Sequence, residues 1–580
     1  MKSYFRILNA AVTAVVAAVA LCSCTSEVSF DEESFDTTVN VGGDAFSLPL
    51  GSTAEMTLGD YMNLSEGDVI HIDENGNYYI EFIQSFEQIV SMSDFAERLT
   101  IEGLVHELDP ATVTVPDKDG LEDASGEDAV LDLGVNEEFA YEFGFEEARG
   151  NGLVRIDRLN LGNASLQPKV RLLCDRPLPE SLRVQVQLKV PSRYEFEDSP
   201  MVDGQIVTFT GDVDGNGQVS FRPLTFSAIE FDNVEGQEQS FTFVDEFEVV
   251  HFLLYLNADD LDGLSGSSIT ADLTVAAGSE DGYIYPESFI GRVDVNIDPV
   301  NDIIELKDVP DVLKSEDARL DFYSPSITAS LSSNSSVRVN MDADIVPVFP
   351  VGGGKPLSLE MSTPVSSSSD VTETSKYWIS TDRPSDLAPE YEWIEADVKG
   401  LLERIPDAVE VNVLASTDSE QDALIECYED YVVSGEFEFN IPFSFGENFN
   451  LTVCDTIYGM PAILSSILRA SDVTLSGEIK STMPVDVNLS AYFLDSLLNR
   501  LDIPVTEQPV NSTGADLSPV VTPLNITAAR TDFQNDIYAI VLAFNLLPGE
   551  IPGISLSAES SVQADIVLKV PGGITFDINQ

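Results

Sequence analysis

The sequence predicts an all-β protein built of tandem antiparallel β-sandwich domains with few short helices. The main observation is a period-two alternation of apolar and polar residues. In residues 181–190, Val184 and Val186 alternate with Gln185 and Gln187, the pattern of a strand with one buried and one solvated face. The same alternation returns in residues 337–345, 485–493 and 562–570. One apolar and one wet face is what an antiparallel sandwich requires.

Turn chemistry is the second observation. Asn75-Gly76 lies between two apolar runs at 69–72 and 78–82, and Asn-Gly supplies the positive φ angles of tight hairpins. The glycine-rich segment 211–217 separates two further apolar runs in the same way. Both segments predict hairpins.

The four alternating strands share a context, which is the third observation. Each follows a short strand and a brief polar or proline-containing turn; these preceding strands are 166–173, 327–331, 473–479 and 554–558. The recurrence is explained either by internal duplication or by the hairpins that every sandwich contains.

Few helices are expected. Residues 394–405 carry apolar side chains at helical spacing and are followed by Pro406, and residues 461–468 form a weaker candidate. The predicted organisation is a signal segment at 1–23, an acidic tether at 24–41, a β domain at 42–115, a sandwich at 130–300 and a C-terminal sandwich region at 310–580 that forms one or two domains.

The N-terminus has the pattern of an export signal. Lys2 and Arg6 precede an apolar run of about 15 residues, which is short for a membrane-spanning helix. The run ends in Leu21-Cys22-Ser23-Cys24, which resembles the bacterial lipobox. That resemblance implies cleavage before Cys24 and acylation of this cysteine, whose chains would anchor the protein in a membrane.

The chain is strongly acidic, with a net charge of −71 from 29 basic and 100 acidic residues. Such a charge repels phosphates and excludes nucleic-acid binding. Hydrophobic residues make up 43% of the chain, as in folded proteins, so the acids are expected to cover solvated surfaces.

Two sites of covalent or metal chemistry are weak candidates. Cys427 and Cys454 could form a disulfide in an oxidising compartment, although buried free thiols are common. Asp212, Asp214 and Asn216 match the opening of a calcium loop, but Pro223 occupies the twelfth position, where a bidentate glutamate is needed. A hairpin turn is the preferred interpretation, and no other cofactor is expected.

No catalytic motif is evident. His71, His106 and His251 all lie in strand-like segments, and a structural role is the preferred interpretation for each. Two carboxylates would suffice for glycoside hydrolysis, but with 100 acids that requirement carries no information.

Exposed aromatic side chains are the best candidate for a ligand surface. Trp378 and Trp393, the only two tryptophans, lie near Tyr377 and Tyr391. Aromatic rings stack on sugar faces in carbohydrate-binding sandwiches, although packing at the edge of the core beside residues 394–405 is the preferred interpretation of these side chains.

The mature chain resembles the uncharacterised multi-domain β-sandwich lipoproteins of Bacteroidota outer membranes. The resemblance rests on the lipobox, on the segments 48–53 and 570–574, and on the repeated strand units. It implies a lipid-anchored, surface-exposed protein of the outer membrane without an assigned activity. The first hypothesis is a non-enzymatic binding or structural module with a glycan or surface protein as partner. A fimbrial subunit that assembles by strand exchange and a polysaccharide hydrolase are the alternatives.

Overall fold

The structure is a computed structural model of the whole chain. It describes residues 38–41, 45–52, 56–57, 69–117, 129–233, 237–257, 259–295, 297–307, 309–350, 354–460, 462–514, 518–571 and 574–577. The prediction of an all-β protein with tandem antiparallel sandwiches is confirmed. Cys24 lies outside the described residues.

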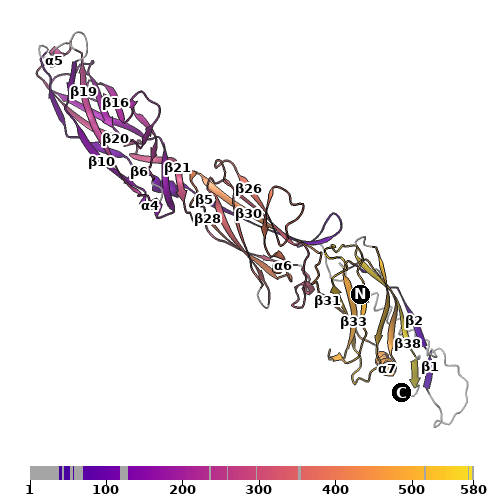
Figure 1. Cartoon of the computed structure of the whole chain (residues 1–580). Coiled ribbons are helices and arrows are strands. Elements are labelled where there is room, and N and C mark those ends of the chain that lie inside the picture. The colour runs from indigo at the N-terminus through magenta and orange to yellow at the C-terminus, as the bar shows by residue number, and fades with distance from the viewer. Residues whose placement is uncertain are drawn as a thin grey trace, which may run out of the picture.

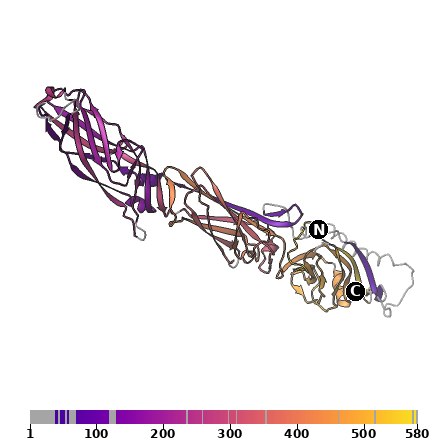
Figure 2. The ribbon, with the colours of Figure 1, turned by 45° about the horizontal axis from the view of Figure 1, so that its top comes forward.

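Three sandwiches follow one another along an elongated molecule (Figure 1). We call them the distal sandwich (residues 93–295 with 423–429), the middle sandwich (69–91, 297–422 and 430–450) and the base sandwich (45–57 and 451–571). Figure 2 shows the same row of three bodies from a second direction.

The distal sandwich contains a seven-stranded and a ten-stranded sheet. The first consists of β9 (Ala129–Asp132), β10 (Glu137–Gly144), β13 (Arg183–Lys189), β15 (Val202–Asp203), β16 (Ile206–Val213), β17 (Val219–Ser220) and β19 (Thr242–Leu256). The second consists of β6 (Ile101–Glu102), β7 (Leu104–Glu107), β8 (Ala111–Thr114), β11 (Leu153–Gly162), β12 (Ser165–Cys174), β14 (Tyr194–Phe196), β18 (Leu224–Glu230), β20 (Ser268–Gly278), β21 (Tyr283–Val293) and β29 (Ala423–Glu426).

The middle sandwich contains a four-stranded and a six-stranded sheet. The first consists of β22 (Val300–Glu305), β24 (Val339–Val348), β25 (Leu357–Ser362) and β28 (Ala408–Thr417). The second consists of β4 (Ile70–Ile72), β5 (Tyr78–Ser91), β23 (Ser326–Ser333), β26 (Glu373–Ser380), β27 (Tyr391–Glu395) and β30 (Asp430–Pro442).

The base sandwich has two five-stranded sheets. The first consists of β2 (Ala45–Ser52), β3 (Met56–Thr57), β32 (Val473–Ser481), β36 (Val520–Ala528) and β38 (Ser561–Pro571). The second consists of β31 (Leu451–Tyr458), β33 (Asp486–Leu494), β34 (Arg500–Leu501), β35 (Gln508–Val510) and β37 (Ala539–Leu547). A separate two-stranded ribbon is formed by β1 (Thr38–Val41) and β39 (Ile574–Asp577).

The three bodies are nested rather than consecutive in the chain. The N-terminal part supplies β2 to the base sandwich, then β5 to the middle one and β7 to the distal one, and the chain returns through the middle to the base. The expected division into 42–115, 130–300 and 310–580 is therefore corrected: segment 42–115 forms no domain of its own. Its strands complete sheets whose other strands lie hundreds of residues away, and local sequence patterns do not record such pairing.

The recurring strand–turn–strand units connect the two sheets of a sandwich. In each pair, β12 and β13, β23 and β24, or β32 and β33, the first strand lies in one sheet and the second in the other. Each sandwich has one such unit, so the expected hairpin is a sheet-to-sheet corner. The fourth sequence occurrence differs, because residues 554–558 contribute only isolated bridges.

The helices in the described residues are short, as expected. They are α3 (Ser93–Leu99), α4 (Glu146–Arg149), α5 (Leu261–Leu264), α6 (Val398–Leu401), α7 (Ala462–Ala470) and the 3-10 helix η2 (Asp311–Lys314). Helix α7 confirms the prediction at 461–468. The prediction at 394–405 is wrong in extent: Ile394 pairs with Ile379 in strand β27, and only one turn of helix, α6, follows.

The buried side chains form two large clusters. One fills the distal sandwich, and the other runs without interruption from the middle sandwich into the base. At the middle–base junction, Leu556 of the base is fully buried, and its N–H donates to the carbonyl of Phe443 at 2.7 Å. The hairpin turn at 73–77 also lies against this segment, since the N–H of Ala558 donates to the carbonyl of Gly76 at 2.8 Å.

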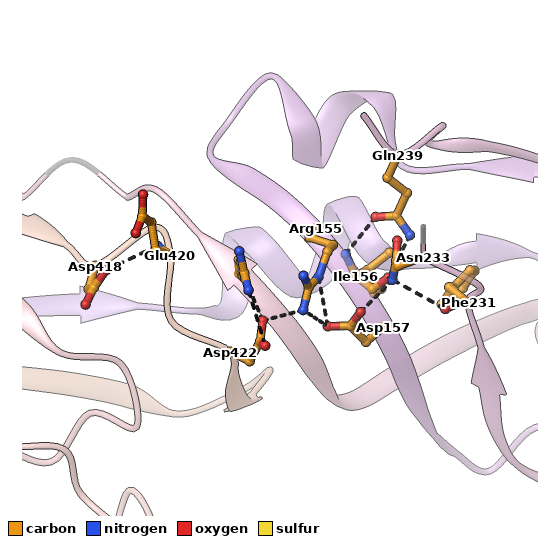
Figure 3. A network of polar contacts seen from close by, with 10 residues as sticks. Arg155, Ile156, Asp157, Phe231, Asn233, Gln239, Asp418, Glu420 and Asp422 are labelled. Atoms are coloured by element: carbon orange, nitrogen blue, oxygen red, sulfur yellow. Dashed lines mark hydrogen bonds and ion pairs between the residues drawn. The ribbon is translucent and has the colours of Figure 1, made fainter. Parts of the chain in front are cut away.

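Charged side chains bridge the distal and middle sandwiches. Asp422, just before β29, accepts from Arg155 at 2.5 Å and from Arg292 at 2.6 Å, and Arg155 also pairs with Asp157 at 3.0 Å. Figure 3 shows Arg155 lying between the two carboxylates. The hydrogen bond from Arg292 lowers the pKa of Asp422, which is therefore ionised at neutral pH.

Candidate functional site: an aromatic face on the middle sandwich

The aromatic face lies on strands β26 and β27 at one edge of the six-stranded sheet. These strands run parallel, and Trp378 is aligned with Trp393 while Lys376 is aligned with Tyr391. Since alternate residues of a strand share a face, all four side chains project from the same side of the sheet. Of the four aromatic residues singled out from the sequence, three are thus brought together.

Tyr377 is separated from the other three. It points to the opposite side, where it is buried in the core, and its hydroxyl donates to the carbonyl of Ser362 at 2.6 Å. Tyr377 is therefore a core residue, and the prediction that it lines the ligand surface is wrong. Its place next to Trp378 in a strand makes this unavoidable.

The rings of the aromatic face are held by specific contacts. Trp378 and Tyr391 pack edge to face with centroids 5.9 Å apart. The indole N–H of Trp393 donates to the hydroxyl of Ser380 at 3.2 Å. The indole N–H of Trp378 is buried and has no hydrogen-bond partner among the described residues, so the accessible part of this side chain is its ring.

Two cations that the sequence analysis did not single out complete this face. The ammonium of Lys376 lies 5.7 Å from the centroid of Tyr391, and the guanidinium of Arg383 lies 5.9 Å from that of Trp393. Both distances fit cation–π contacts. Lys376 could have been found from the sequence, since it alternates with Trp378; Arg383 lies in a loop and gives no such signal.

A groove of about 780 Å³ lies on the same sandwich, beside α6. Its charged lining is internally paired: Arg319 bonds Glu403 at 3.1 Å, and Lys355 bonds Asp397 at 2.8 Å. Helix α6 links the groove to the loop of the aromatic face, because Lys399 bonds Asp382 at 2.9 Å. The groove is polar and charge-compensated, in contrast to the aromatic face.

The candidate calcium loop is a hairpin turn between β16 and β17. Asp212 pairs with Ser220 in the hairpin, and the Asp214 carboxylate accepts backbone N–H groups from Asn216 and Gln218, both at 2.8 Å. These bonds lower the pKa of Asp214. The preferred hairpin interpretation of this segment is confirmed. The described residues contain no group of three or more His, Cys, Asp or Glu side chains placed to hold a metal ion.

The disulfide prediction is wrong. Cys427 is buried in the distal core, Cys454 is exposed on β31 of the base sandwich, and both are free, as is Cys174. Burial raises the pKa of the Cys427 thiol to about 12, so it is protonated and unreactive. The two thiols lie in different sandwiches, a separation that sequence spacing does not reveal.

The histidines lie apart. His71 contacts the ring of Tyr79 in the middle sandwich, His106 stacks on Phe139 in the distal sandwich with centroids 4.1 Å apart, and His251 lies on β19 opposite Gln187. His106 also contacts Glu137 at 3.1 Å. The three occupy strand positions, as expected from the sequence.

The distal sandwich buries one carboxylate, that of Asp245, which is 2% exposed. Tyr194 donates to it at 2.6 Å and Arg193 at 3.2 Å, while burial raises its pKa. These bonds tie β14 and its preceding turn to β19. The network therefore stabilises the distal sandwich internally.

Comparisons with known proteins reveal no family. No protein-family model matches the chain, and no curated protein does. A crystal structure of a "putative secreted protein" from Parabacteroides distasonis aligns with 50% of this chain and 90% of its own at 17% identity and a TM-score of 0.34. A mutant VP2 protein of infectious bursal disease virus aligns with 73% of this chain and 72% of its own at 9% identity and a TM-score of 0.14. These scores are too low to support a functional argument. None of the helices in the described part of the chain is long and apolar enough to span a membrane.

Proposed function

We propose that the chain is a lipid-anchored protein of the bacterial outer membrane that acts as a non-enzymatic binding or structural module at the cell surface. Acyl chains on Cys24 would hold the base sandwich, and the other two sandwiches would project from it. The observation that carries this proposal is the antiparallel pairing of β1 with β39, which joins the first and last described segments of the chain. An anchor that precedes Thr38 would thus attach at the end opposite the distal sandwich (Figure 1).

Two further features support this arrangement. Strands β2 and β38, which contain described parts of the segments 48–53 and 570–574 that carry part of the family resemblance, pair with one another: Leu48 pairs with Leu568, and Ala45 with Pro571. The net charge of −71 suits a solvated projection that does not adhere to acidic neighbours.

Acylation of Cys24 is tested by metabolic labelling with an alkyne-bearing fatty acid. We expect label in the natural chain and in a Cys454→Ala control, which removes an exposed cysteine of the base, but none in Cys24→Ala. Label retained in Cys24→Ala would refute the anchor. Protease treatment of intact cells then separates surface exposure from a periplasmic orientation, since only a surface protein is digested while the membrane is intact.

We propose a glycan as the partner of the aromatic face, because aromatic rings flanked by the cationic side chains of Lys376 and Arg383 suit a ligand that offers both apolar faces and hydroxyl acceptors. Binding on a glycan array should be lost in Trp378→Ala and Trp393→Ala and retained in Tyr428→Ala, an exposed tyrosine of the distal region. If all variants were retained equally on the array, the aromatic face would be ruled out as the glycan-binding site. Release of reducing sugars by the natural chain would instead favour the hydrolase.

A fimbrial subunit remains the second candidate because β1 and β39 form a ribbon hydrogen-bonded to no other described strand. Because each of these two strands pairs only with the other among the described strands, one of them could be exchanged between copies of the chain. Polymers that form in the purified natural chain and disappear on deletion of 574–577 would favour this alternative over a monomeric module.

A further inference from the structure

Three hairpin turns of the chain share one hydrogen-bond pattern. They begin at Asp73, Asp214 and Asp495. In each, Oδ1 of the aspartate accepts the N–H groups of the third and fifth residues at 2.8–2.9 Å. The N–H of the fourth residue donates to the aspartate carbonyl at 2.9–3.0 Å. The turns are therefore close equivalents, and their residues can be compared position by position.

The fourth position of this turn has a left-handed backbone. It is Gly76 with φ of 82° in the first turn and Gly217 with φ of 79° in the second, but Leu498 with φ of 63° in the third. Glycine adopts this conformation freely, whereas a leucine does so at an energetic cost. The other described non-glycine residues with positive φ are Asn163 and Asp321, types that tolerate it. A leucine kept here against backbone preference points to a use for its side chain.

The side chains of this turn face solvent. Leu497 is 78% exposed and Leu498 is 55% exposed. The buried carboxylate of Asp495 holds the turn in place, and it also accepts a hydrogen bond from the side-chain amide of Asn535 at 2.7 Å. Tyr458 and Tyr538 are exposed nearby with rings 6.1 Å apart, and the N–H of Tyr538 donates to the carbonyl of Leu494 at 2.8 Å. We call these four exposed residues, Leu497, Leu498, Tyr458 and Tyr538, the apolar tip; they lie at the same end of neighbouring strands β31, β37 and β33.

The apolar tip lies at the end of the base sandwich that carries the ribbon of β1 and β39. Strand β31 starts next to Asn450, which bridges to Arg319 of the middle sandwich, and ends at Tyr458. Tyr458 is aligned with Ala539, which is aligned with Leu494, so the tip lies away from the middle sandwich. Helix α7, which follows β31 at this end, contacts β39 of the terminal ribbon (Figure 1).

We propose that the apolar tip inserts into the lipid bilayer that carries the anchor and so orients the base sandwich on the membrane. The proposal rests on the anchoring proposed above. Residues 25–37 separate Cys24 from β1, and 13 residues span at most about 45 Å, so the tip stays within reach of the bilayer. Tethering raises the effective concentration of the tip at the membrane, so even a weak affinity of the tip for lipid would orient the base sandwich. Exposed leucines beside tyrosines match the composition of membrane interfaces, where tyrosine rings lie at the headgroup level.

The test uses tryptophan fluorescence quenched by brominated acyl chains. The chain from residue 25, carrying an N-terminal histidine tag, is bound to phosphatidylcholine vesicles through nickel-chelating lipids, which replaces the acyl anchor. In Leu497→Trp we expect the added fluorescence to fall about twofold on bromolipid vesicles, since interfacial side chains lie at the headgroup–acyl boundary. Leu414→Trp, at a position of the middle sandwich that is 58% exposed, should be unaffected. The natural tryptophans, Trp378 and Trp393, contribute the same background fluorescence in both variants.

A second variant separates this role from folding. Leu498→Gly, which restores the residue of the two equivalent turns, should leave the thermal midpoint unchanged or higher. Combined with Leu497→Trp in one chain, it should lower the quenching of the added indole. Unquenched Leu497→Trp on tethered vesicles would overturn the proposal, and dimers that depend on Leu497 and Leu498 would assign the tip to self-association instead. Because the histidine tag replaces Cys24 as the tether, a failure of tip insertion is distinguishable from the absence of a lipid anchor.

Discussion

At the residue scale, the hairpin turns depend on one backbone conformation and one carboxylate. The fourth position of each turn needs a positive φ, and in the turn at 214–218 it also needs space. A Cβ on Gly217 would lie 2.1 Å from the carbonyl oxygen of Leu172, whereas a Cβ on Gly215 would meet nothing within 4 Å.

We therefore predict that Gly217→Ala destabilises the distal sandwich by about 1–3 kcal/mol, through the left-handed backbone and the clash with strand β12. Gly215→Ala, two residues away, should change the free energy of unfolding by less than about 0.5 kcal/mol. Urea denaturation of both variants measures the difference. Equal effects would show that the turn tolerates a side chain at its fourth position.

The carboxylate of Asp214 makes the same turn sensitive to acid. Its backbone hydrogen bonds lower its pKa below the ordinary value of 3.8, so the ionised form is preferred in the folded state. The resulting stabilisation is present above pH 3.8 and disappears as the pH falls through the folded-state pKa. The urea midpoints of the natural chain and Asp214→Asn should therefore differ at pH 7 and converge as the pH falls below 3.8 through the folded-state pKa. A gap that widens with acid would contradict this assignment.

At the element scale, strands were predictable and their partners were not. Residues 181–190 and 485–493 were recognised because side-chain alternation is a local property, and they correspond to β13 and β33. The helix expected at 394–405 failed because Ile394 has a better partner in Ile379, which the apolar spacing alone does not show. Likewise, alternation could have assigned Tyr377 and Trp378 to opposite faces, but the direction of each face depends on distant strands.

Substitutions at two adjacent residues of strand β26 should consequently have different effects, one on the stability of the fold and the other on ligand binding. Tyr377→Phe removes a hydrogen bond to Ser362 in the core, and we expect it to lower stability by about 1 kcal/mol while glycan binding is retained. Trp378→Phe removes a buried indole N–H that has no partner among the described residues, so we expect little change in stability. The smaller ring reduces the aromatic surface and should weaken binding. Thermal denaturation and array binding of both variants test the assignment; a binding loss in Tyr377→Phe alone would reverse it.

At the scale of the whole molecule, the nested path determines how the sandwiches cooperate. One core runs from the middle sandwich into the base, where a smaller separate cluster includes Leu468 and Phe493. The distal sandwich has its own core, and Val90 packs against both large cores. At the boundary between these cores lies a small apolar cavity of about 20 Å³, lined in part by Val90 and Met92. Packing is thus continuous at one junction and divided at the other, although the chain crosses each junction more than once.

We predict two calorimetric unfolding transitions rather than three, one for the distal sandwich and one for the middle and base sandwiches together. Phe252 and Phe439 are fully buried in the distal and the shared core, respectively. Phe252→Ala should lower only the first transition and Phe439→Ala only the second, each by about 3–5 kcal/mol in free energy of unfolding. The two variants serve as controls for one another. If Phe439→Ala shifted the middle sandwich while a third, base transition stayed in place, the shared core would not act as one cooperative unit, and the base would be an independent platform.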